Sequence, residues 1–148
     1  VALECARLGA ASVAVAGLDA QRAVRLAGEL RAAAPAVRVA AAESAEERTA
    51  AARAADLVVQ ATPVGTKAGD PSPLPPQAFR PGAAAFDLVY VHPETAFLRA
   101  AREGGARGTN GLGMLLHQGA RSFEIWNGAM PPVEPMRRAL ERAVYGAA

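Results

Sequence analysis

Short apolar runs alternate with stretches of helical periodicity along nearly the whole chain. The apolar runs lie at 12–16, 37–40, 56–60 and 84–88, and a shorter extended piece follows at 106–109. Around them the periodicity predicts helices at 1–8, 20–33, 44–54, 95–103, 114–126 and 136–144. Strands that are each followed by a helix are typical of parallel sheets. We therefore expect an α/β fold, with helices on both faces of a parallel sheet.

Residues at the predicted helix ends support these boundaries. Asp19 is placed to cap the second helix, and Pro35 ends it. Ser44 and Glu47 have the S-x-x-E spacing of a capping box, which opens the third helix. Thr95 has the same capping role before the fourth helix. Capping residues and periodicity thus agree on where the elements begin.

The order of the elements is that of a Rossmann-type unit that lacks its first strand. The chain opens on an apolar helix containing Val1, Leu3 and Leu8, where such a unit has a strand and a glycine-rich loop. In the Rossmann order the first strand is central and its loop holds the dinucleotide phosphates. We expect residues 1–148 to form an NAD(P)-binding domain with C-terminal helices, truncated at its N-terminus and without an N-terminal catalytic domain.

Composition argues against several classes of partner. The net charge is only +2, and the arginines are interleaved with acidic residues, which is typical of a solvated surface rather than a nucleic-acid patch. No apolar run approaches the roughly 20 residues of a membrane span. The one cysteine, Cys5, is expected to be a small buried helix residue, and His92 and His117 lie far apart, so no metal site is predicted. We expect a cytoplasmic protein without nucleic-acid or membrane partners; a homodimer stays open.

The first candidate site follows the strand 12–16, in the run Gly17-Leu18-Asp19-Ala20-Gln21-Arg22. In dinucleotide-binding folds a carboxylate here accepts hydrogen bonds from the ribose hydroxyls of NAD, whereas an arginine pairs with the 2′-phosphate of NADP. Asp19 therefore favours NAD and Arg22 favours NADP. Asp19 as a helix cap and Arg22 as a surface residue are compatible with either.

Two further candidate sites lie later in the chain. Thr62-Pro63 follows the strand 56–60, where open α/β sheets bind their ligands. The run 110–118 places two glycines before a helix, where backbone N–H groups can approach a ligand. Met114 and Gln118 then share one helix face. The same helix is expected to bury an apolar stripe made of Leu112, Leu115, Leu116, Phe123 and Trp126.

Three segments together resemble the shikimate dehydrogenase family. They are Ala61-Thr62-Pro63-Val64-Gly65, then Phe86-Asp87-Leu88-Val89-Tyr90-Val91-His92-Pro93-Glu94-Thr95, then Asn110-Gly111-Leu112-Gly113-Met114-Leu115-Leu116-His117-Gln118-Gly119-Ala120. The N-G-L-G-M-L-x-x-Q run is the most specific of them. The resemblance covers nearly the whole chain, through 123–126 and the turn 131–136.

The resemblance implies reversible reduction of 3-dehydroshikimate to shikimate with NADP or NAD. It places substrate contacts at Tyr90 and Gln118. It places cofactor contacts at Gly17, Leu18, Asp19, Arg22, Thr62, Pro63, Leu88, Gly111 and Met114. The family's catalytic lysine and aspartate belong to its N-terminal domain, so the resemblance implies no catalytic residue in this chain. We expect the chain alone to be inactive.

Two departures from the family pattern matter. Leu18 stands where NADP-using members commonly have the arginine that binds the 2′-phosphate, so NAD stays open as cofactor. Gln60 stands where an asparagine commonly precedes the A-T-P run, and we expect an altered loop hydrogen bond with unchanged chemistry. Two alternatives also stay open: a quinate/shikimate dehydrogenase that uses NAD, and a non-catalytic dinucleotide-binding domain.

Overall fold

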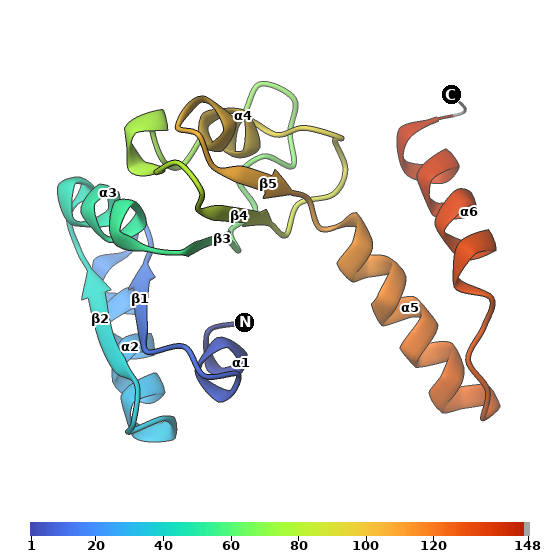
Figure 1. Cartoon of the computed structure of the whole chain (residues 1–148), viewed down its shortest axis with the longest axis horizontal. Helices are drawn as coiled ribbons and strands as arrows, with labels where there is room; N and C mark the ends of the chain where they lie inside the picture. The colour runs from blue at the N-terminus through green and yellow to red at the C-terminus, as the bar shows by residue number, and fades with distance from the viewer. Residues whose placement is uncertain (147–148) are drawn as a thin grey trace. The chain divides into compact units, whose positions relative to one another are not determined.

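A computed structural model describes residues 1–146, which fold into two compact units, Val1–Ala54 and a second that begins at Ala55. All strand pairs in both units are parallel, and helices alternate with strands along the chain (Figure 1). This confirms the predicted α/β class. No helix within the described residues is long and apolar enough to cross a membrane.

The first unit is a two-stranded sheet with its helices. It contains α1 (Ala2–Arg7), β1 (Ser12–Ala16), α2 (Ala20–Ala33), β2 (Arg38–Ala42) and α3 (Ala45–Ala54). β1 and β2 pair in register over their whole lengths, and α2 packs against both strands. The small core consists of Ala6, Val15, Ala23, Ala27 and Leu30. Cys5, which was expected to be buried, is only half-buried, because the buried residue of its short helix is Ala6.

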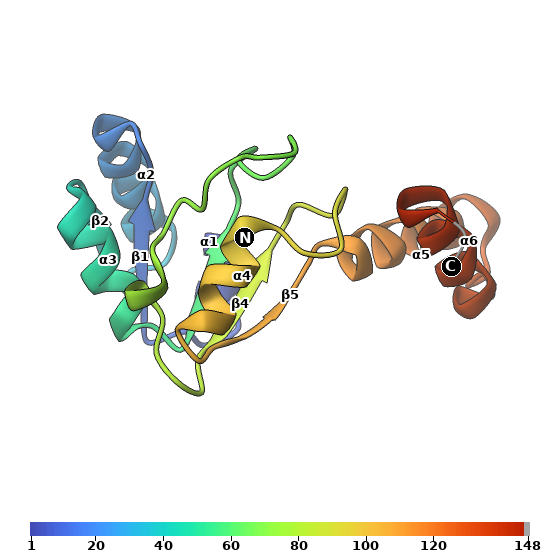
Figure 2. The ribbon, with the colours of Figure 1, turned by 90° about the horizontal axis from the view of Figure 1, so that it is seen from above.

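The second unit holds a three-stranded sheet in the order β3-β4-β5. Its elements are β3 (Leu57–Gln60), the 3-10 turn η1 (Pro76–Ala78), β4 (Ala84–Asp87), α4 (Ala96–Glu103), β5 (Arg107–Thr109), α5 (Leu112–Asn127) and α6 (Val133–Tyr145). α4 packs against β4 and β5, as the view from above shows (Figure 2). Phe97 of α4 meets Phe79 edge to face, with ring centroids 5.4 Å apart.

Among the described residues, β1 and β3 are both edge strands. β1 pairs only with β2, and β3 pairs only with β4. The Rossmann order has its first strand between the second and the fourth. The observed pairing is therefore the one that the predicted order gives when its first strand is absent from the sheet.

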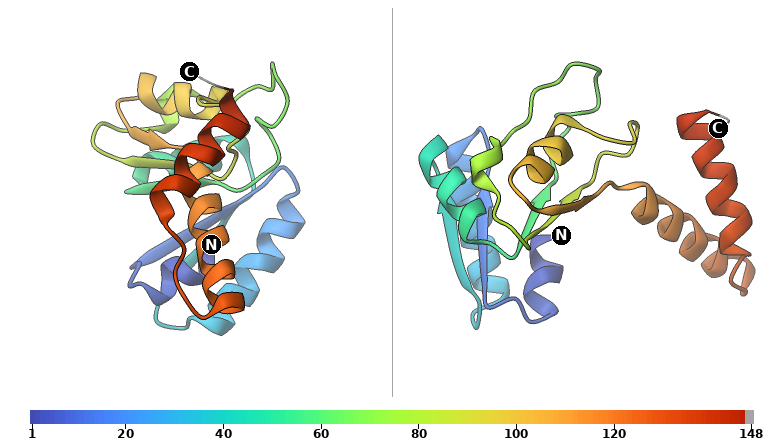
Figure 3. Two further views of the ribbon diagram at one scale, coloured as in Figure 1. Left: turned by 90° about the vertical axis from the view of Figure 1, so that its right-hand side faces the viewer. Right: turned by 45° about the horizontal axis from the view of Figure 1, so that its top comes forward.

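The predicted apolar stripe of α5 is only partly buried. Leu112 and Leu116 are buried, but Phe123 is 43% exposed and Trp126 is 80% exposed. The prediction failed for these two residues because α5 leaves the sheet after its first turns and then packs mainly against α6 (Figure 3). α6 contributes no buried residue among those described. The helix pair consequently carries an exposed apolar surface.

Candidate functional site

The loops that follow β3 and β4 line one cavity. The cavity has a volume of about 220 Å³ and is lined mostly by apolar atoms. Three predicted site residues, Thr62, Leu88 and Tyr90, lie in its wall; the other lining residues are Ala61, Thr66, Val89 and Val91. The carboxyl ends of parallel strands meet at one edge of a sheet, which explains why residues 26 to 28 positions apart in sequence share a pocket.

The turn before α5 packs directly on the loop after β4. The Gly111 N–H donates to the carbonyl oxygen of Val89 at 3.2 Å. A Cβ atom on Gly111 would lie 2.3 Å from the carbonyl oxygen of Leu88, so only glycine fits there. Predicted residues Gly111 and Leu88 are therefore in contact. The glycine is required by backbone packing, in addition to any role toward a ligand.

Met114 and Gln118 follow on α5. Met114 is half-buried and Gln118 is exposed one turn later, so the amide of Gln118 is available to a ligand. Tyr90 is half-buried and lies at the same edge of the sheet as Gly111, since both follow the carboxyl ends of neighbouring strands. The spacing prediction that Met114 and Gln118 share a face holds because both lie within one uninterrupted helix.

Asn110 stabilises the turn before α5 through hydrogen bonds of its side chain, a role that the sequence did not predict. Its amide Nδ2 donates to the His92 carbonyl at 3.2 Å, to the Pro93 carbonyl at 3.3 Å and to the Tyr145 hydroxyl at 2.6 Å. Its Oδ1 accepts from the N–H of Leu112 at 3.2 Å. An asparagine two residues before the first helical N–H groups is a recognisable capping signal. The long-range contacts to His92 and Tyr145 have no such signal.

Thr62 and Pro63 belong to a tightly hydrogen-bonded but exposed loop. The Pro63 carbonyl accepts from the N–H of Thr66 at 3.2 Å and from its hydroxyl at 2.7 Å. Asp70 closes the loop by accepting from the N–H of Gly65 at 2.8 Å and of Lys67 at 3.1 Å. These two N–H groups, Lys67 first, lower the pKa of the Asp70 carboxyl.

The predicted ribose loop lies in the first unit, at the carboxyl end of β1. Asp19 caps α2 by accepting from the N–H of Arg22 at 2.9 Å, as predicted. Leu18 is 91% exposed, and Arg22 is also exposed. Arg48, which the sequence reasoning missed, reaches this loop from α3: its Nη1 lies 3.5 Å from the Gly17 carbonyl and 3.4 Å from that of Glu43. No pattern in the sequence links Arg48 to a residue 31 positions away.

The chain matches known proteins along nearly its whole length. The family model described as the shikimate 5′-dehydrogenase C-terminal domain matches residues 111–141. The NADP(+) shikimate dehydrogenase of Moorella thermoacetica is 42% identical over 146 residues, which cover 97% of this chain and 49% of that protein. The chain belongs to the shikimate dehydrogenase family. It spans about half the length of this curated relative.

Solved structures of the shikimate dehydrogenase family agree with this fold. The enzyme of Thermus thermophilus, in complex with NADP(H) and shikimate, is 36% identical with a TM-score of 0.77, over 97% of this chain and 50% of that one. Quinate dehydrogenase from Corynebacterium glutamicum, in complex with NAD, is 34% identical with a TM-score of 0.77, over 93% of this chain and 49% of that one. The Rossmann-type prediction is therefore confirmed.

Proposed function

We propose that this chain is the cofactor-binding half of a shikimate dehydrogenase, which interconverts 3-dehydroshikimate and shikimate with a nicotinamide dinucleotide. One observation carries the proposal: Thr62, Leu88 and Tyr90 line one cavity, and Gly111 packs against Leu88 beside it. These residues come from three separate segments, and the family resemblance assigns all of them to the nicotinamide and substrate site. A non-catalytic dinucleotide-binding domain would also explain the cofactor contacts, but it gives no role to Tyr90 and Gln118.

The residues present fit a flat aromatic ligand. Gly111 has no side chain where the loop after β4 approaches most closely, and the cavity wall beside it is apolar. Leu88, Gly111 and Met114 would hold the nicotinamide half, and Thr62 and Pro63 would line the adjoining cleft. When bound, the dinucleotide supplies the hydride, while the protein supplies orientation and excludes water.

Tyr90 and Gln118 are the polar groups that we assign to the substrate. A phenol hydroxyl and a primary amide can each donate and accept hydrogen bonds, which suits a ligand with several adjacent hydroxyl groups. Gln118 is exposed and Tyr90 half-buried, so neither is sealed in the core. We assign no proton transfer to either side chain, because holding the ring hydroxyls requires only hydrogen bonding.

The ribose loop supplies groups for either cofactor. Asp19 offers a carboxylate to the hydroxyls of NAD, whereas Arg22 and Arg48 offer guanidinium groups to the 2′-phosphate of NADP. Leu18, at 91% exposure, contributes no charge. We therefore propose NADP or NAD as cofactor, and the NAD-bound quinate dehydrogenase relative makes NAD-dependent oxidation of quinate the second candidate function.

The test is an assay of the complete gene product with shikimate and with quinate, each with NADP and with NAD. We expect shikimate-dependent reduction of at least one dinucleotide, and a higher kcat/KM for shikimate than for quinate. The opposite ranking would favour the second candidate. Absence of turnover with all four pairs, in a protein that still binds a dinucleotide, would reject the dehydrogenase and leave a binding domain.

Location and assembly are smaller parts of the proposal. We propose a cytoplasmic enzyme whose partners are small molecules rather than nucleic acid or membrane, supported by the interleaved surface charges of both signs. Sedimentation of the complete protein would distinguish a homodimer from a monomer.

A further inference from the structure

A buried carboxylate immediately precedes the cavity-lining residues Leu88–Val91 in the sequence. Asp87 is the last residue of β4 and is 0% exposed. Its partner in the β3–β4 register is Gln60, the last residue of β3, which is 4% exposed. Buried charges are costly unless hydrogen bonds compensate them. The partners of Asp87 therefore indicate what this residue holds in place.

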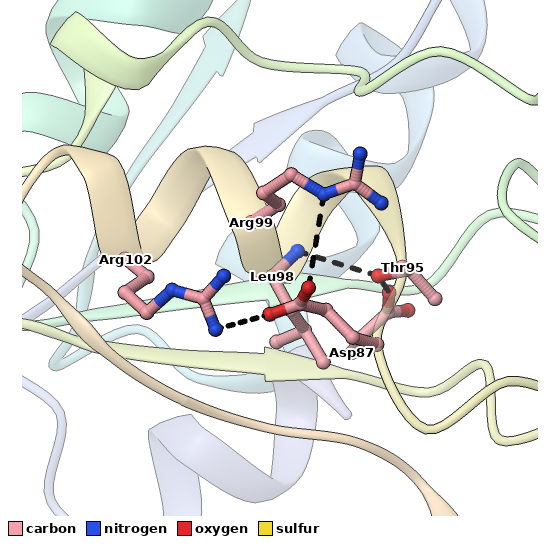
Figure 4. Close-up of polar contacts among 6 residues, drawn as sticks. Asp87, Thr95, Leu98, Arg99 and Arg102 are labelled. Carbon is pink, nitrogen blue, oxygen red and sulfur yellow. Dashed lines mark hydrogen bonds and ion pairs between the residues drawn. The ribbon is translucent and has the colours of Figure 1, made fainter.

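Asp87 accepts hydrogen bonds from three segments. Its Oδ1 accepts from the Val89 N–H at 3.0 Å and from the Gln60 amide Nε2 at 3.3 Å. Its Oδ2 accepts from the Thr95 hydroxyl at 2.6 Å, and Thr95 in turn caps α4 at the N–H of Leu98 (Figure 4). One carboxylate thus fastens the end of β3, the loop after β4 and the start of α4.

Gln60 carries this link into the opposite wall of the cavity. Its Nε2 also donates to the Val64 carbonyl at 2.7 Å, and its Oε1 accepts from the N–H of Thr62. The Gln60 side chain therefore spans the loop that presents Thr62. Gly65 adopts φ +100°, which favours glycine, in the part of this loop that lies next to Thr95.

We propose that Asp87 and Gln60 form a positioning pair that sets the separation between the Thr62 wall and the Leu88–Tyr90 wall of the cavity. The proposal rests on the proposed function, in which both walls contact the cofactor or the substrate. Neither residue touches a ligand. The nearby ion pairs of Glu94 with Arg99 and Arg102 are exposed and contribute little, whereas the Asp87 contacts are buried (Figure 4).

Kinetics of the complete gene product test the pair. Asp87→Asn keeps the side-chain volume but removes one acceptor oxygen, so one of the three donors loses its partner. We expect the KM for the dinucleotide and for the acid substrate to rise together by about tenfold. A merely structural role would lower the amount of active enzyme, and hence the maximal rate, while both KM values stayed at the wild-type level; that outcome would overturn the proposal.

Matched variants separate the hydroxyl and the amide from general destabilisation. Thr95→Ser retains the hydroxyl, so both KM values should stay at the wild-type level. Thr95→Val keeps the shape of the side chain but removes the hydroxyl, so both KM values should rise. Gln60→Leu should raise both KM values, and adding Asp87→Asn to it should add less than about a further twofold, because the two residues act as one link. Asp56→Asn is the control: Asp56 precedes β3 at the opposite end and pairs with Arg80, so both KM values should be unchanged.

Amide hydrogen exchange provides a readout that needs no turnover. In Asp87→Asn we expect faster exchange in 61–66 and in 88–91 together, with α2 of the first unit unaffected. Faster exchange confined to 88–91 would mean that the Asp87 carboxylate holds only the loop after β4. That result would overturn the proposal that Asp87 and Gln60 act as a pair. A wild-type protein without dehydrogenase activity would reject the proposed function, yet it would leave this exchange comparison valid.

Discussion

Asp19 follows β1 in the loop before α2, whereas Asp87 is the last residue of β4, and the two aspartates have different roles. Asp19 lies in an exposed loop and accepts a hydrogen bond from Arg22, three residues away. Asp87 is buried and accepts from Gln60, Val89 and Thr95, across three segments. The first is a local helix cap in a loop open to solvent. The second organises the cavity walls, which suits a region where reacting groups must be held in fixed geometry.

The difference predicts that the two ends tolerate change unequally. An exposed cap can be exchanged for another capping residue, and cofactor choice can then vary without loss of the fold. The end of β4 and its neighbour Gly111 have no such freedom, because Asp87 is fully buried and the Leu88 backbone leaves no room for a side chain at Gly111. Variants at the two ends should therefore differ in both size and kind of effect.

The largest effect is expected at Gly111. In Gly111→Ala the new Cβ would lie 2.3 Å from the Leu88 carbonyl oxygen, so the two loops must separate. We expect a loss of about 3 kcal/mol in the free energy of unfolding, measured by urea denaturation. Gly113→Ala is the control, since nothing lies within 4 Å of its added Cβ, and it should be neutral or stabilise α5 by up to roughly 1 kcal/mol. Equal effects of the two variants would contradict the packing described.

Gln118 should show the next largest effect, on activity rather than stability. Gln118→Ala in the complete protein is expected to lower kcat/KM for shikimate by the equivalent of roughly 1–3 kcal/mol, as when a hydrogen bond to a bound ligand is lost. Because Gln118 is exposed, the thermal midpoint should not change. His117→Ala alters the preceding exposed side chain and should leave turnover unchanged. An unaltered kcat/KM in Gln118→Ala would remove this residue from the substrate site.

At the β1 end, two replacements of Asp19 separate capping from cofactor binding. Asp19→Ala removes both, and should cost about 1 kcal/mol in the stability of the first unit. Asp19→Asn keeps a capping oxygen but removes the charge, so stability should be retained. If the carboxylate also binds the ribose of NAD, then the KM for NAD rises in both variants while the KM for NADP does not. Identical KM values for NAD in wild type and Asp19→Asn would leave Asp19 as a cap alone.

The smallest effects concern stability at low pH. Each unit contains a carboxyl group whose pKa is lowered in the folded state. Backbone N–H groups lower the pKa of Glu47 in the first unit, through Glu43 and then Ser44, and of Asp70 in the second, through Lys67 and then Gly65. A lowered pKa in the folded state gives stability that is present above the ordinary values of 4.5 and 3.8 and is lost as pH falls through the folded-state pKa.

Thermal midpoints measured over falling pH test this assignment. Glu47→Gln and Asp70→Asn keep an acceptor oxygen but cannot titrate, so each should flatten the acid decline of its own unit. Since Glu47 is exposed and Asp70 is only half-buried, the change should be small. A decline as steep as that of the wild type in both variants would mean that other groups govern acid unfolding.

The same contrast explains how far the sequence could predict the structure. Local signals were sufficient for the Asp19 cap, the Ser44–Glu47 capping box and the Thr95 cap, because each depends on residues three positions apart. Gly111 and the loop 88–90 are in contact, and Thr62 shares a cavity with that loop, since the carboxyl ends of parallel strands converge. Burial of Phe123 and Trp126 was predicted wrongly, because periodicity shows which residues share a face but not what covers that face.

Long-range contacts could not be read from the sequence. The bond from Gln60 to Asp87 spans 27 positions, and the one from Asn110 to Tyr145 spans 35. Such contacts depend on strand register and helix packing, which local propensity does not determine. The sequence reasoning expected only an altered loop bond at Gln60, whereas the structure gives this residue contacts in two segments.

Amide exchange of the complete protein with and without its ligands tests the central claim most directly. Our account predicts that NADP or NAD protects 17–22, 61–66 and the turn at Gly111, and that shikimate added to the dinucleotide complex extends protection to Tyr90 and Gln118. Unchanged amide exchange in 61–66, 88–91 and 111–118, with both ligands at saturating concentrations, would contradict the assignment of this cavity to the dehydrogenase site.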